Sequence, residues 1–236
     1  MNLLALQRNL QEFDLEIFTL NDVIKITEQT KTCIKSTLTR WVKQKKIFRV
    51  KKGYYSLQKI ENKFQLQRVY NETYIGLHSA LEYYGSTTQR FNNLDLITKN
   101  RLNEQKIENT RIQFHKVSSK LFFGYERATI NKTKVFISSI EKTLIDCIYF
   151  SSKVYLTDIN EFIRKNKKTI NRETMIVYLK RINSSALNKR VGYLLEINNI
   201  SLKGLNINNK YEKLNVNLNK KGTINTKWKL IINEKL

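Results

Sequence analysis

Residues 31–57 read KTCIKSTLTRWVKQKKIFRVKKGYYSL, and this stretch decides the fold that we expect. Its first half has the apolar spacing of a helix, and its second half has the spacing of two short strands. Between Lys31 and Lys52 it contains nine lysine or arginine residues and no acidic residue. A basic helix followed by a two-stranded hairpin, or wing, predicts the DNA-contacting half of a winged helix-turn-helix.

The helical half has one apolar face and one polar face. At about 100° per residue, one face carries Ile34, Leu38, Trp41 and Val42. The opposite face carries Thr32, Ser36, Thr39, Arg40 and Lys43. Hydroxyl groups can donate or accept at base edges, and a guanidinium can bind guanine O6 and N7 together. A helix of about 14 residues is about 21 Å long, and one polar face of it fits the major groove.

The wing is predicted at 47–50 and 54–57, with Lys51 and Lys52 at its tip and Gly53 in the turn. The predicted DNA-binding set is Lys31, Thr32, Lys35, Ser36, Thr39, Arg40, Lys43, Lys45, Lys46, Arg49, Lys51, Lys52 and Tyr54. An ordinary solvated surface helix has the same amphipathic pattern, and it remains the alternative for the helix taken alone. The basic, glycine-turned hairpin favours the winged helix.

The composition favours a polyanionic partner. The chain of 236 residues has 43 basic and 20 acidic side chains, a net charge of +23. Nucleic acid is the first candidate for a partner of such a charge. The chain is also rich in Lys, Asn and Ile and has no Pro, so coding bias can contribute, and charge alone does not locate a site. The length allows two domains or one large domain.

Neither a metal nor a cofactor is expected. Cys33 and Cys147 are isolated and lie within amphipathic patterns, so we expect buried or half-buried thiols in a reducing compartment. There is no CxxC or HExxH, and there are only two His residues. The N-terminal apolar run is too short for a signal sequence, and no 18-residue apolar span occurs. We therefore expect a soluble, cytoplasmic protein.

The residues before the basic helix complete the motif. Residues 1–14 have apolar positions at helical spacing, and Thr19 with Asp22 forms a capping-box pattern at the start of a second helix. Thr30 is the expected N-cap of the basic helix. Helix, helix, turn, basic helix and hairpin is the order of a winged helix-turn-helix. We place this DNA-binding domain at residues 1–60.

A polar junction is predicted at 61–72, followed by a C-terminal domain at 73–236. The predicted fold class is α+β, with the N-terminal winged helix-turn-helix followed by a larger mixed α/β domain that ends in a β-hairpin. The segments expected in the second domain are a helix at 73–84 ended by Gly85, strands at 94–98, 111–117, 128–131 and 134–138, a helix capped by Ser138 with Glu141, three helices within 158–198, and two strands around Lys220-Lys221-Gly222.

A second basic zone lies among the three helices. Its members are Arg164, Lys165, Lys167, Lys168, Arg172, Lys180, Arg181, Lys189 and Arg190. It is a candidate surface for DNA or for an RNA. The alternative is a pair of exposed helices in a lysine-rich chain.

No catalytic constellation is evident. Glu141 and Asp146 lie five residues apart, about 140° around one helix, so they do not converge on one atom. Neither His78 nor His115 has a nearby acid or nucleophile in the pattern of a catalytic triad. No P-loop and no nucleotidyltransferase signature occurs. We therefore expect a protein that is not an enzyme.

The order FTLNDVIKIT, TKTCIKSTLTRWVKQKKIFRVKKGYYSL and TYIGLHSALEYYGSTTQ resembles the AbiEi family of antitoxins of type IV abortive-infection toxin–antitoxin systems. KLFFGYERATINKTKVFISSIEKTLIDCIYF resembles that family's strand pair and its helix with an E-K-x-L-x-D core. KYEKLNVNLNKKGTINTKWKLIIN resembles its closing hairpin. The resemblance covers most of the chain, and its motifs are patterns of apolar and small residues.

This resemblance implies a DNA-binding antitoxin and transcriptional autorepressor in phage defence. It implies binding of double-stranded DNA at inverted repeats in the protein's own promoter, by a protein that is monomeric in solution and binds as two copies. It also implies a nucleotidyltransferase-like toxin that is neutralised without a stable complex. Because the sequence has no long apolar span, no membrane partner is expected. The alternatives are a winged-helix protein that acts on RNA such as tRNA, or a nucleic-acid-modifying enzyme. A protein-interaction module is disfavoured by the nine basic residues on the face that it would bury.

Overall fold

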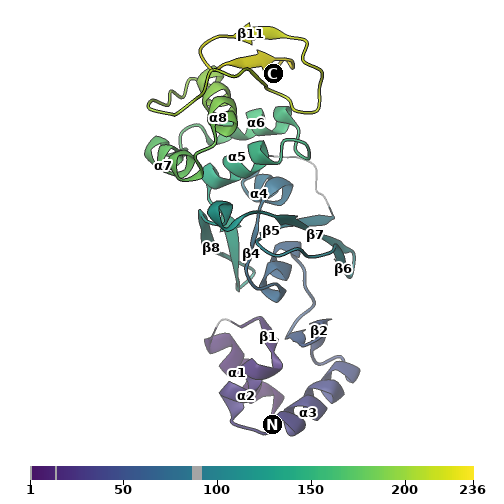
Figure 1. Cartoon of the computed structure of the whole chain (residues 1–236). Helices are drawn as coiled ribbons and strands as arrows, with labels where there is room; N and C mark the ends of the chain where they lie inside the picture. The colour runs from purple at the N-terminus through teal and green to yellow at the C-terminus, as the bar shows by residue number, and fades with distance from the viewer. Residues whose placement is uncertain (1, 14, 87–91) are drawn as a thin grey trace.

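A computed structural model describes residues 2–13, 15–86 and 92–236 of the chain. The protein is a mixed α+β structure, as predicted. Figure 1 shows the N-terminal helices at one end, a β-sheet in the middle and a layer of helices beyond it, with the last strands at the other end. No helix within the described ranges combines the length and the apolar content that crossing a membrane requires.

The N-terminal part contains three helices and a small sheet. Its elements are α1 (Leu3–Glu12), β1 (Ile17–Thr19), α2 (Leu20–Thr27), α3 (Lys31–Lys43), β2 (Phe48–Lys51) and β3 (Tyr54–Ser56). The strands pair antiparallel in the order β1-β3-β2. The helices and strands of this part share a core that includes Leu10, Phe18 and Leu38. The predicted helices and hairpin of this region are confirmed.

Local sequence signals fix the helix starts. Thr19 Oγ1 accepts from Asp22 N at 3.2 Å, and Asp22 Oδ2 accepts from Thr19 N at 2.8 Å, so the predicted capping box is confirmed. Thr30 is the N-cap of α3, also as predicted, although its side chain makes no capping bond. The apolar face of α3 is buried at Ile34 and Trp41. Helical periodicity therefore predicted both the helix and its orientation.

The middle of the molecule is a six-stranded sheet of order β6-β7-β5-β4-β9-β8. Its strands are β4 (Thr73–Ile75), β5 (Asn93–Thr98), β6 (Gln105–Ile107), β7 (Thr110–Lys116), β8 (Tyr125–Ile130) and β9 (Thr133–Ser138). Pairs β5–β7 and β4–β9 are parallel, and the other pairs are antiparallel. The four predicted strands are confirmed, while β4 and β6 were not predicted.

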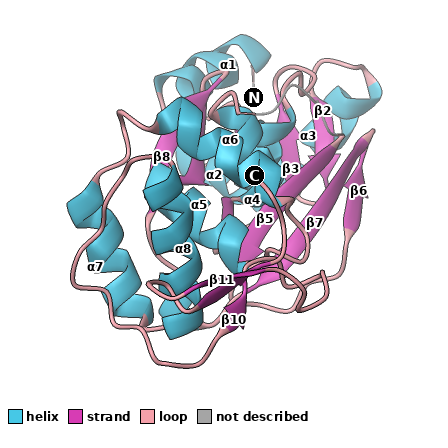
Figure 2. Cartoon of the chain, turned by 90° about the horizontal axis from the view of Figure 1, so that it is seen from above, coloured by secondary structure: helices cyan, strands magenta, loops and turns pink. Residues whose placement is uncertain are grey.

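Elements pack on both faces of this sheet. The 3₁₀-helix η1 (Lys63–Val69) covers the face that carries Ile75 and Leu96. Helices α4 (Leu77–Tyr83) and α5 (Ile140–Tyr149) cover the face that carries Tyr74 and Ile97. Figure 2 shows α5, α7 and α8 on one side of β5, β7 and β6.

The predicted junction at 61–72 is instead part of the folded sheet layer. Gln65 and Gln67 are buried in η1. Gln65 Nε2 donates to Thr133 Oγ1 at 2.9 Å, and Gln67 Nε2 donates to Thr73 O at 2.8 Å. The polar composition was misleading because these amides satisfy buried polar groups of neighbouring strands. The helix predicted at 73–84 is wrong over its first residues, which form β4.

The helical layer matches the prediction apart from one cap. Helices α6 (Leu156–Asn166), α7 (Arg172–Ile182) and α8 (Ser185–Ile197) follow α5 and the short η2 (Ser119–Leu121) precedes it. Ser139, not Ser138, is the N-cap of α5. Ser138 Oγ instead lies 2.7 Å from Thr143 Oγ1 in the core.

The closing sheet differs from the prediction. Its strands are β10 (Glu212–Lys213), β11 (Thr223–Asn225) and β12 (Leu230–Ile232), in the order β10-β12-β11. The antiparallel hairpin is β11–β12, so the predicted turn at 220–222 lies before the hairpin. Lys213 Nζ donates to Val216 O at 2.6 Å and to Leu218 O at 2.7 Å. These two hydrogen bonds hold the segment of alternating Leu214, Val216 and Leu218 as a loop and not as a strand.

Candidate nucleic-acid interface

The polar face of α3 is exposed along its whole length. Thr32, Lys35, Ser36, Thr39, Arg40 and Lys43 line one shallow hollow on it. Lys31 is exposed at the start of the helix. The structure therefore brings the predicted α3 residues together on one surface.

The hydroxyl groups on this face are oriented by the helix itself. Ser36 Oγ donates to Cys33 O at 2.9 Å, and Thr39 Oγ1 donates to Lys35 O at 2.8 Å. Each hydrogen is used by the backbone, so each oxygen presents its lone pairs to the solvent. In this conformation the two hydroxyls are acceptors, and the acceptors' partners in the major groove are the amino groups of adenine and cytosine.

The cations around this face lie apart from the acidic side chains that the structure describes. In the part of the chain that the structure describes, no carboxylate lies within ion-pair distance of Lys31, Lys35, Arg40, Lys43, Lys45, Lys46, Arg49 or Lys52. All eight are exposed. Unpaired cations produce a positive surface potential that attracts phosphates.

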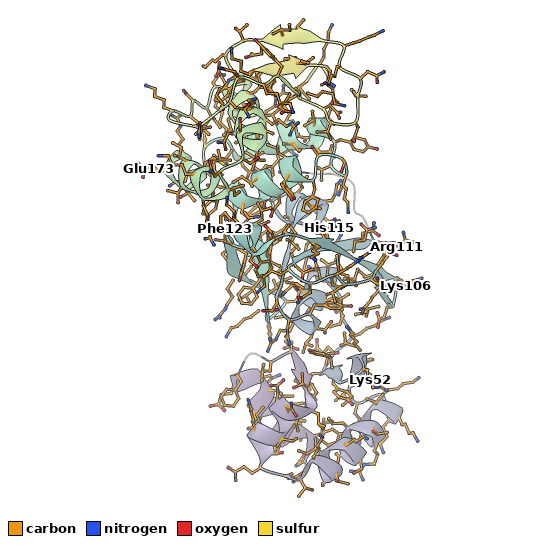
Figure 3. All side chains as sticks on the ribbon, viewed as in Figure 1. Lys52, Lys106, Arg111, His115, Phe123 and Glu173 are labelled. Carbon is orange, nitrogen blue, oxygen red and sulfur yellow. The ribbon has the colours of Figure 1, made fainter. Side chains whose placement is uncertain are left out.

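Fewer residues of the wing are exposed beside the α3 face than the sequence predicts. Gly53 has φ +87°, and Lys52 is exposed beside it at the turn (Figure 3). Lys51 instead lies with its ammonium 4.0 Å from the centroid of the Tyr70 ring, and burial lowers its pKa. Tyr54 packs against the hydrophobic cluster of the sheet. Lys51 and Tyr54 turn toward the sheet because the wing lies against it.

Two further cations lie on the same side of the molecule as the wing. Figure 3 shows Lys52, Lys106 and Arg111 along one edge. Lys106 of β6 and Arg111 of β7 are directly paired across the antiparallel ladder and are exposed. Arg111 Nε also pairs with Glu104 at 3.0 Å. The sequence prediction missed these residues because β6 itself was not predicted.

The second basic zone is only partly a surface. Arg164, Lys167, Lys168, Arg172 and Lys180 are exposed on α6 and α7 and the segment between them. Lys165 pairs with Glu161 at 2.9 Å, and the Arg181 guanidinium lies 4.0 Å from the Phe123 ring centroid.

Lys189 and Arg190 do not belong to that surface. Lys189 is buried and donates to Asn208 Oδ1 at 2.6 Å and to Lys210 O. Arg190 Nε donates to Lys213 O at 2.9 Å. Lys189 therefore holds the segment before β10 against α8, and Arg190 holds β10 itself there. No local sequence pattern indicates this long-range role.

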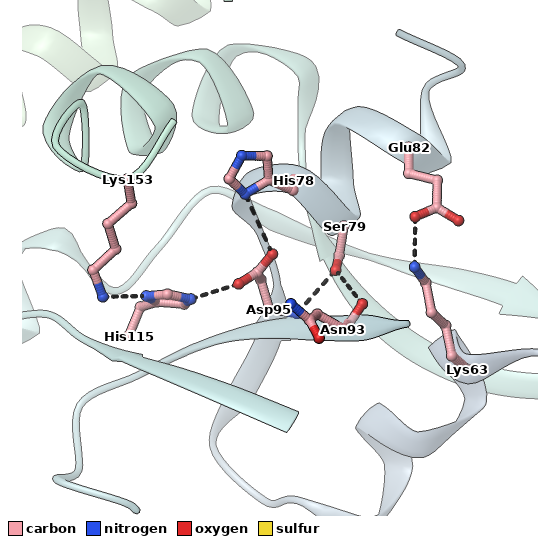
Figure 4. Close-up of polar contacts among 8 residues, drawn as sticks. All are labelled: Lys63, His78, Ser79, Glu82, Asn93, Asp95, His115 and Lys153. Carbon is pink, nitrogen blue, oxygen red and sulfur yellow. Dashed lines mark hydrogen bonds and ion pairs between the residues drawn. The ribbon is translucent and has the colours of Figure 1, made fainter. Parts of the chain in front are cut away.

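A buried polar cluster joins the two histidines that the sequence left without a partner (Figure 4). His115 Nε2 lies 2.7 Å from Asp95 Oδ1, and Lys153 Nζ lies 3.0 Å from His115 Nδ1. An ammonium group can only donate, so Nδ1 accepts and Nε2 carries the hydrogen that is donated to Asp95. His78 Nδ1 lies 3.7 Å from Asp95 Oδ2. The expectation that no acid lies near these histidines is wrong, because Asp95 is close only in the fold.

This environment sets the ionisation of Asp95. Burial raises the pKa of its carboxyl group, but the contacts with His115 and His78 outweigh burial and lower the pKa to about 2. The charged carboxylate is therefore held between two imidazoles at neutral pH. In the described residues, no group of three or more His, Cys, Asp or Glu side chains is arranged to hold a metal ion.

The E-K-x-L-x-D sequence has a structural explanation. Lys142 and Asp146 form a buried ion pair, and both contact the Tyr74 hydroxyl, at 2.9 and 3.0 Å. Burial lowers the pKa of Lys142, against the opposing effect of Asp146. Glu141 Oε1 accepts from Asn171 N at 2.8 Å, at the start of α7. The motif therefore ties α5 to the sheet and to α7.

The two cysteines differ in exposure. Cys147 is buried, as expected, and burial raises the pKa of its thiol well above the usual value. Cys33 is exposed, so the expectation of burial is wrong for it. It lies on α3 one residue before Ile34, at the border of the polar face.

No family model and no curated protein sequence matches this chain. Similar solved structures include the crystal structure of RV2827C protein from Mycobacterium tuberculosis. Its TM-score is 0.64 at 11% sequence identity, and the alignment covers 96% of this chain and 89% of that chain. At this identity the likeness establishes a shared fold over nearly the whole chain.

Proposed function

We propose that the N-terminal part is a winged helix-turn-helix that binds double-stranded DNA, with α3 as its recognition helix. The exposed polar face of α3 carries this proposal. It combines two hydroxyl acceptors with unpaired cations, and the opposite face anchors the helix through buried Ile34 and Trp41. Side chains of this kind read base edges and contact phosphates when a helix lies in the major groove.

We further propose that the chain is an antitoxin of the AbiEi type and a cytoplasmic autorepressor. Two copies would bind inverted repeats in its own promoter, and the C-terminal part would oppose a nucleotidyltransferase-like toxin without a stable complex. The support is the sequence resemblance in the segments that contain α3, the wing and α5. No observation favours RNA modification or another enzyme activity over this role.

The DNA-binding proposal is tested with a fluorescent duplex from the chain's own promoter and a scrambled duplex of equal length. The variant is Ser36→Ala with Thr39→Val, which removes both acceptors; Val matches Thr in size, and Ala is smaller than Ser by the hydroxyl alone. We expect a loss of about tenfold in affinity for the promoter duplex only, as two modest hydrogen bonds would give. Thr169→Val, at an exposed hydroxyl that likewise donates to a backbone oxygen, is the matched control. If variant and wild type bind the promoter duplex equally well, α3 does not lie in the major groove.

The antitoxin proposal needs a separate measurement. The reading frame next to this one is expressed alone and together with this chain in growing cells. We expect the neighbour to be a nucleotidyltransferase-like protein that arrests growth, and this chain to restore growth. A neighbour without toxicity, or toxicity that this chain does not relieve, would refute the antitoxin role without affecting the DNA-binding result.

A further inference from the structure

A second, smaller hollow lies between the end of α1 and strands β8 and β9. Leu15 forms a backbone bridge with Thr133, which holds the chain after α1 against β9. In Figures 1 and 2, α1 and β8 lie on one side of the molecule and α3 lies on the other. The hollow is therefore a separate surface from the α3 face.

Exposed aromatic rings line this hollow. Phe13, at the end of α1, is 59% exposed, and Phe136 of β9 is 38% exposed. The Phe136 ring packs edge-on against Tyr125 at 5.6 Å between centroids. The Arg127 guanidinium lies 5.9 Å from the Phe136 centroid. These contacts orient the Phe136 ring, so it is a preformed and accessible stacking surface.

Two arginines flank the rings, and Glu126, the acid adjacent to one of them in sequence, faces elsewhere. Arg68 of η1 and Arg127 of β8 line the hollow and are exposed. Within residues 2–13, 15–86 and 92–236, neither arginine has a carboxylate at ion-pair distance. Glu126 lies next to Arg127, but its carboxylate accepts from the Tyr84 hydroxyl at 3.4 Å, on the other face of the strand. The electrostatic complement of this surface is an anion.

The size of the hollow distinguishes among anions. Its volume is about 190 Å³, below the roughly 300 Å³ at which pockets for whole small molecules begin. A single flat ring that is part of a longer polymer fits this volume better than a whole small molecule does. Aromatic side chains beside arginines are the means by which proteins hold unpaired strands, since each base has a face that can stack. A duplex presents base edges only, so its bases cannot stack here.

We propose that this hollow binds single-stranded nucleic acid, with one base stacked on Phe136 and with phosphates held by Arg68 and Arg127. Phe13 covers the stacked base from the α1 side. This inference goes beyond the proposed function, and it does not depend on DNA binding by α3.

The test uses the full chain and fluorescein-labelled 12-nucleotide probes, oligouridylate and oligothymidylate. Excess unlabelled duplex DNA occupies the α3 face during the titration. Phe136→Leu keeps the apolar volume and removes the ring. We expect it to weaken binding by about 5- to 150-fold, the range measured for loss of one stacked base. Tyr155→Leu, at an exposed aromatic residue that is the N-cap of α6, is the matched control and should leave binding unchanged.

The phosphate contacts are tested through salt. Arg127→Gln is expected to lower the slope of log affinity against log salt by about 0.7, the value for one phosphate contact on a single strand. Arg101→Gln, at another exposed arginine, should leave the slope unchanged. Thermal unfolding of each variant confirms that it folds.

The outcomes separate the interpretations. The site is supported if Phe136→Leu weakens binding of the RNA probe, of the DNA probe or of both. The probe that is affected shows whether the site takes single-stranded RNA, single-stranded DNA or either. No binding of either probe by the wild type overturns the proposal. Binding that is equally strong in Phe136→Leu also overturns it, because charge alone would then account for the interaction.

Discussion

Lys51 and Lys52 are adjacent in sequence but have different surroundings. Lys52 is exposed at the turn, and Lys51 lies over Tyr70. We expect Lys52→Ala to lower the salt slope of duplex binding by about 0.9, the value of one phosphate contact. Lys51→Ala should leave that slope unchanged and lower the unfolding free energy by about 1 kcal/mol, through loss of the cation–π contact. Equal slopes for wild type and Lys52→Ala would show that the wing tip does not contact DNA.

Asp95 makes the stability of the protein depend on acid pH. Its pKa falls from 3.8 to about 2 on folding, so the unfolded chain binds a proton more readily than the folded chain. The stabilisation, about 2 kcal/mol, is nearly complete at pH 5 and is lost progressively as pH falls through 3.8 toward 2.

Urea unfolding between pH 5 and pH 2.5 measures this effect. We expect the difference in unfolding free energy between wild type and Asp95→Asn to shrink steadily over that range. His115→Gln removes a contact that lowers the pKa and should reduce the pH dependence. A difference between wild type and Asp95→Asn that stays constant with pH would contradict the assignment.

At the residue scale, prediction from sequence succeeded where exposure follows local periodicity. Helical spacing was sufficient to place Ser36 and Thr39 on the open face of α3. It failed for Lys51 and Lys189 because their partners, Tyr70 and Asn208, are distant in sequence. The partnership of Asp95 with His115 also depends on the parallel register of β5 and β7. No local pattern encodes that register.

Helix α8 meets the closing sheet at a glycine. A Cβ atom at Gly192 would lie 2.1 Å from the Trp228 ring. Alanine is favoured over glycine by about 1 kcal/mol within a helix, but we expect the clash to dominate, so that Gly192→Ala lowers the unfolding free energy by about 1–3 kcal/mol.

A double-mutant cycle isolates the cause. Trp228→Leu shortens the side chain that the added methyl group would meet. In that background Gly192→Ala should cost much less than in the wild type, or should stabilise the protein. The same cost in both backgrounds would show that α8 does not pack on Trp228 in this way. Chemical denaturation followed by circular dichroism provides the four free energies.

At the element scale, long amphipathic helices were predictable and very short strands were not. Helices α3, α5, α6, α7 and α8 each have several turns of apolar spacing. Strands β4, β6 and β10 have two or three residues each, too few to show an alternation. The sequence of η1 predicts a junction and not a buried helix because its inward positions include glutamines. Their burial depends on hydrogen bonds to strands that follow later in the chain.

The N-terminal part and the six-stranded sheet share a hydrophobic cluster. Ile17 of β1 is buried in the cluster of the six-stranded sheet, and Val50 packs against it. We therefore expect the N-terminal part to unfold together with the sheet. In Trp228→Phe, Trp41 is the remaining tryptophan and reports on the N-terminal part. Its fluorescence transition in urea should coincide with the circular dichroism transition of the whole chain.

A second substitution in the Trp228→Phe background tests the role of the shared cluster. Adding Ile17→Ala removes a buried contact between the N-terminal part and the six-stranded sheet and should lower the unfolding free energy by about 2–5 kcal/mol. We expect the Trp41 transition to move to lower urea, ahead of the circular dichroism transition. Separate transitions already present without Ile17→Ala would show that the N-terminal part and the sheet unfold independently.

The packing of Lys51 on Tyr70 also fixes where a bound duplex would lie. It holds the wing against the sheet, so the paired cations Lys106 and Arg111 stay at a set position beyond the wing tip. A duplex seated on α3 and extended past Lys52 would run along that edge. On the wing side, the full chain would then protect a longer stretch of DNA from hydroxyl-radical cleavage than the N-terminal part could cover alone. Neutralising both Lys106 and Arg111 would shorten that stretch again.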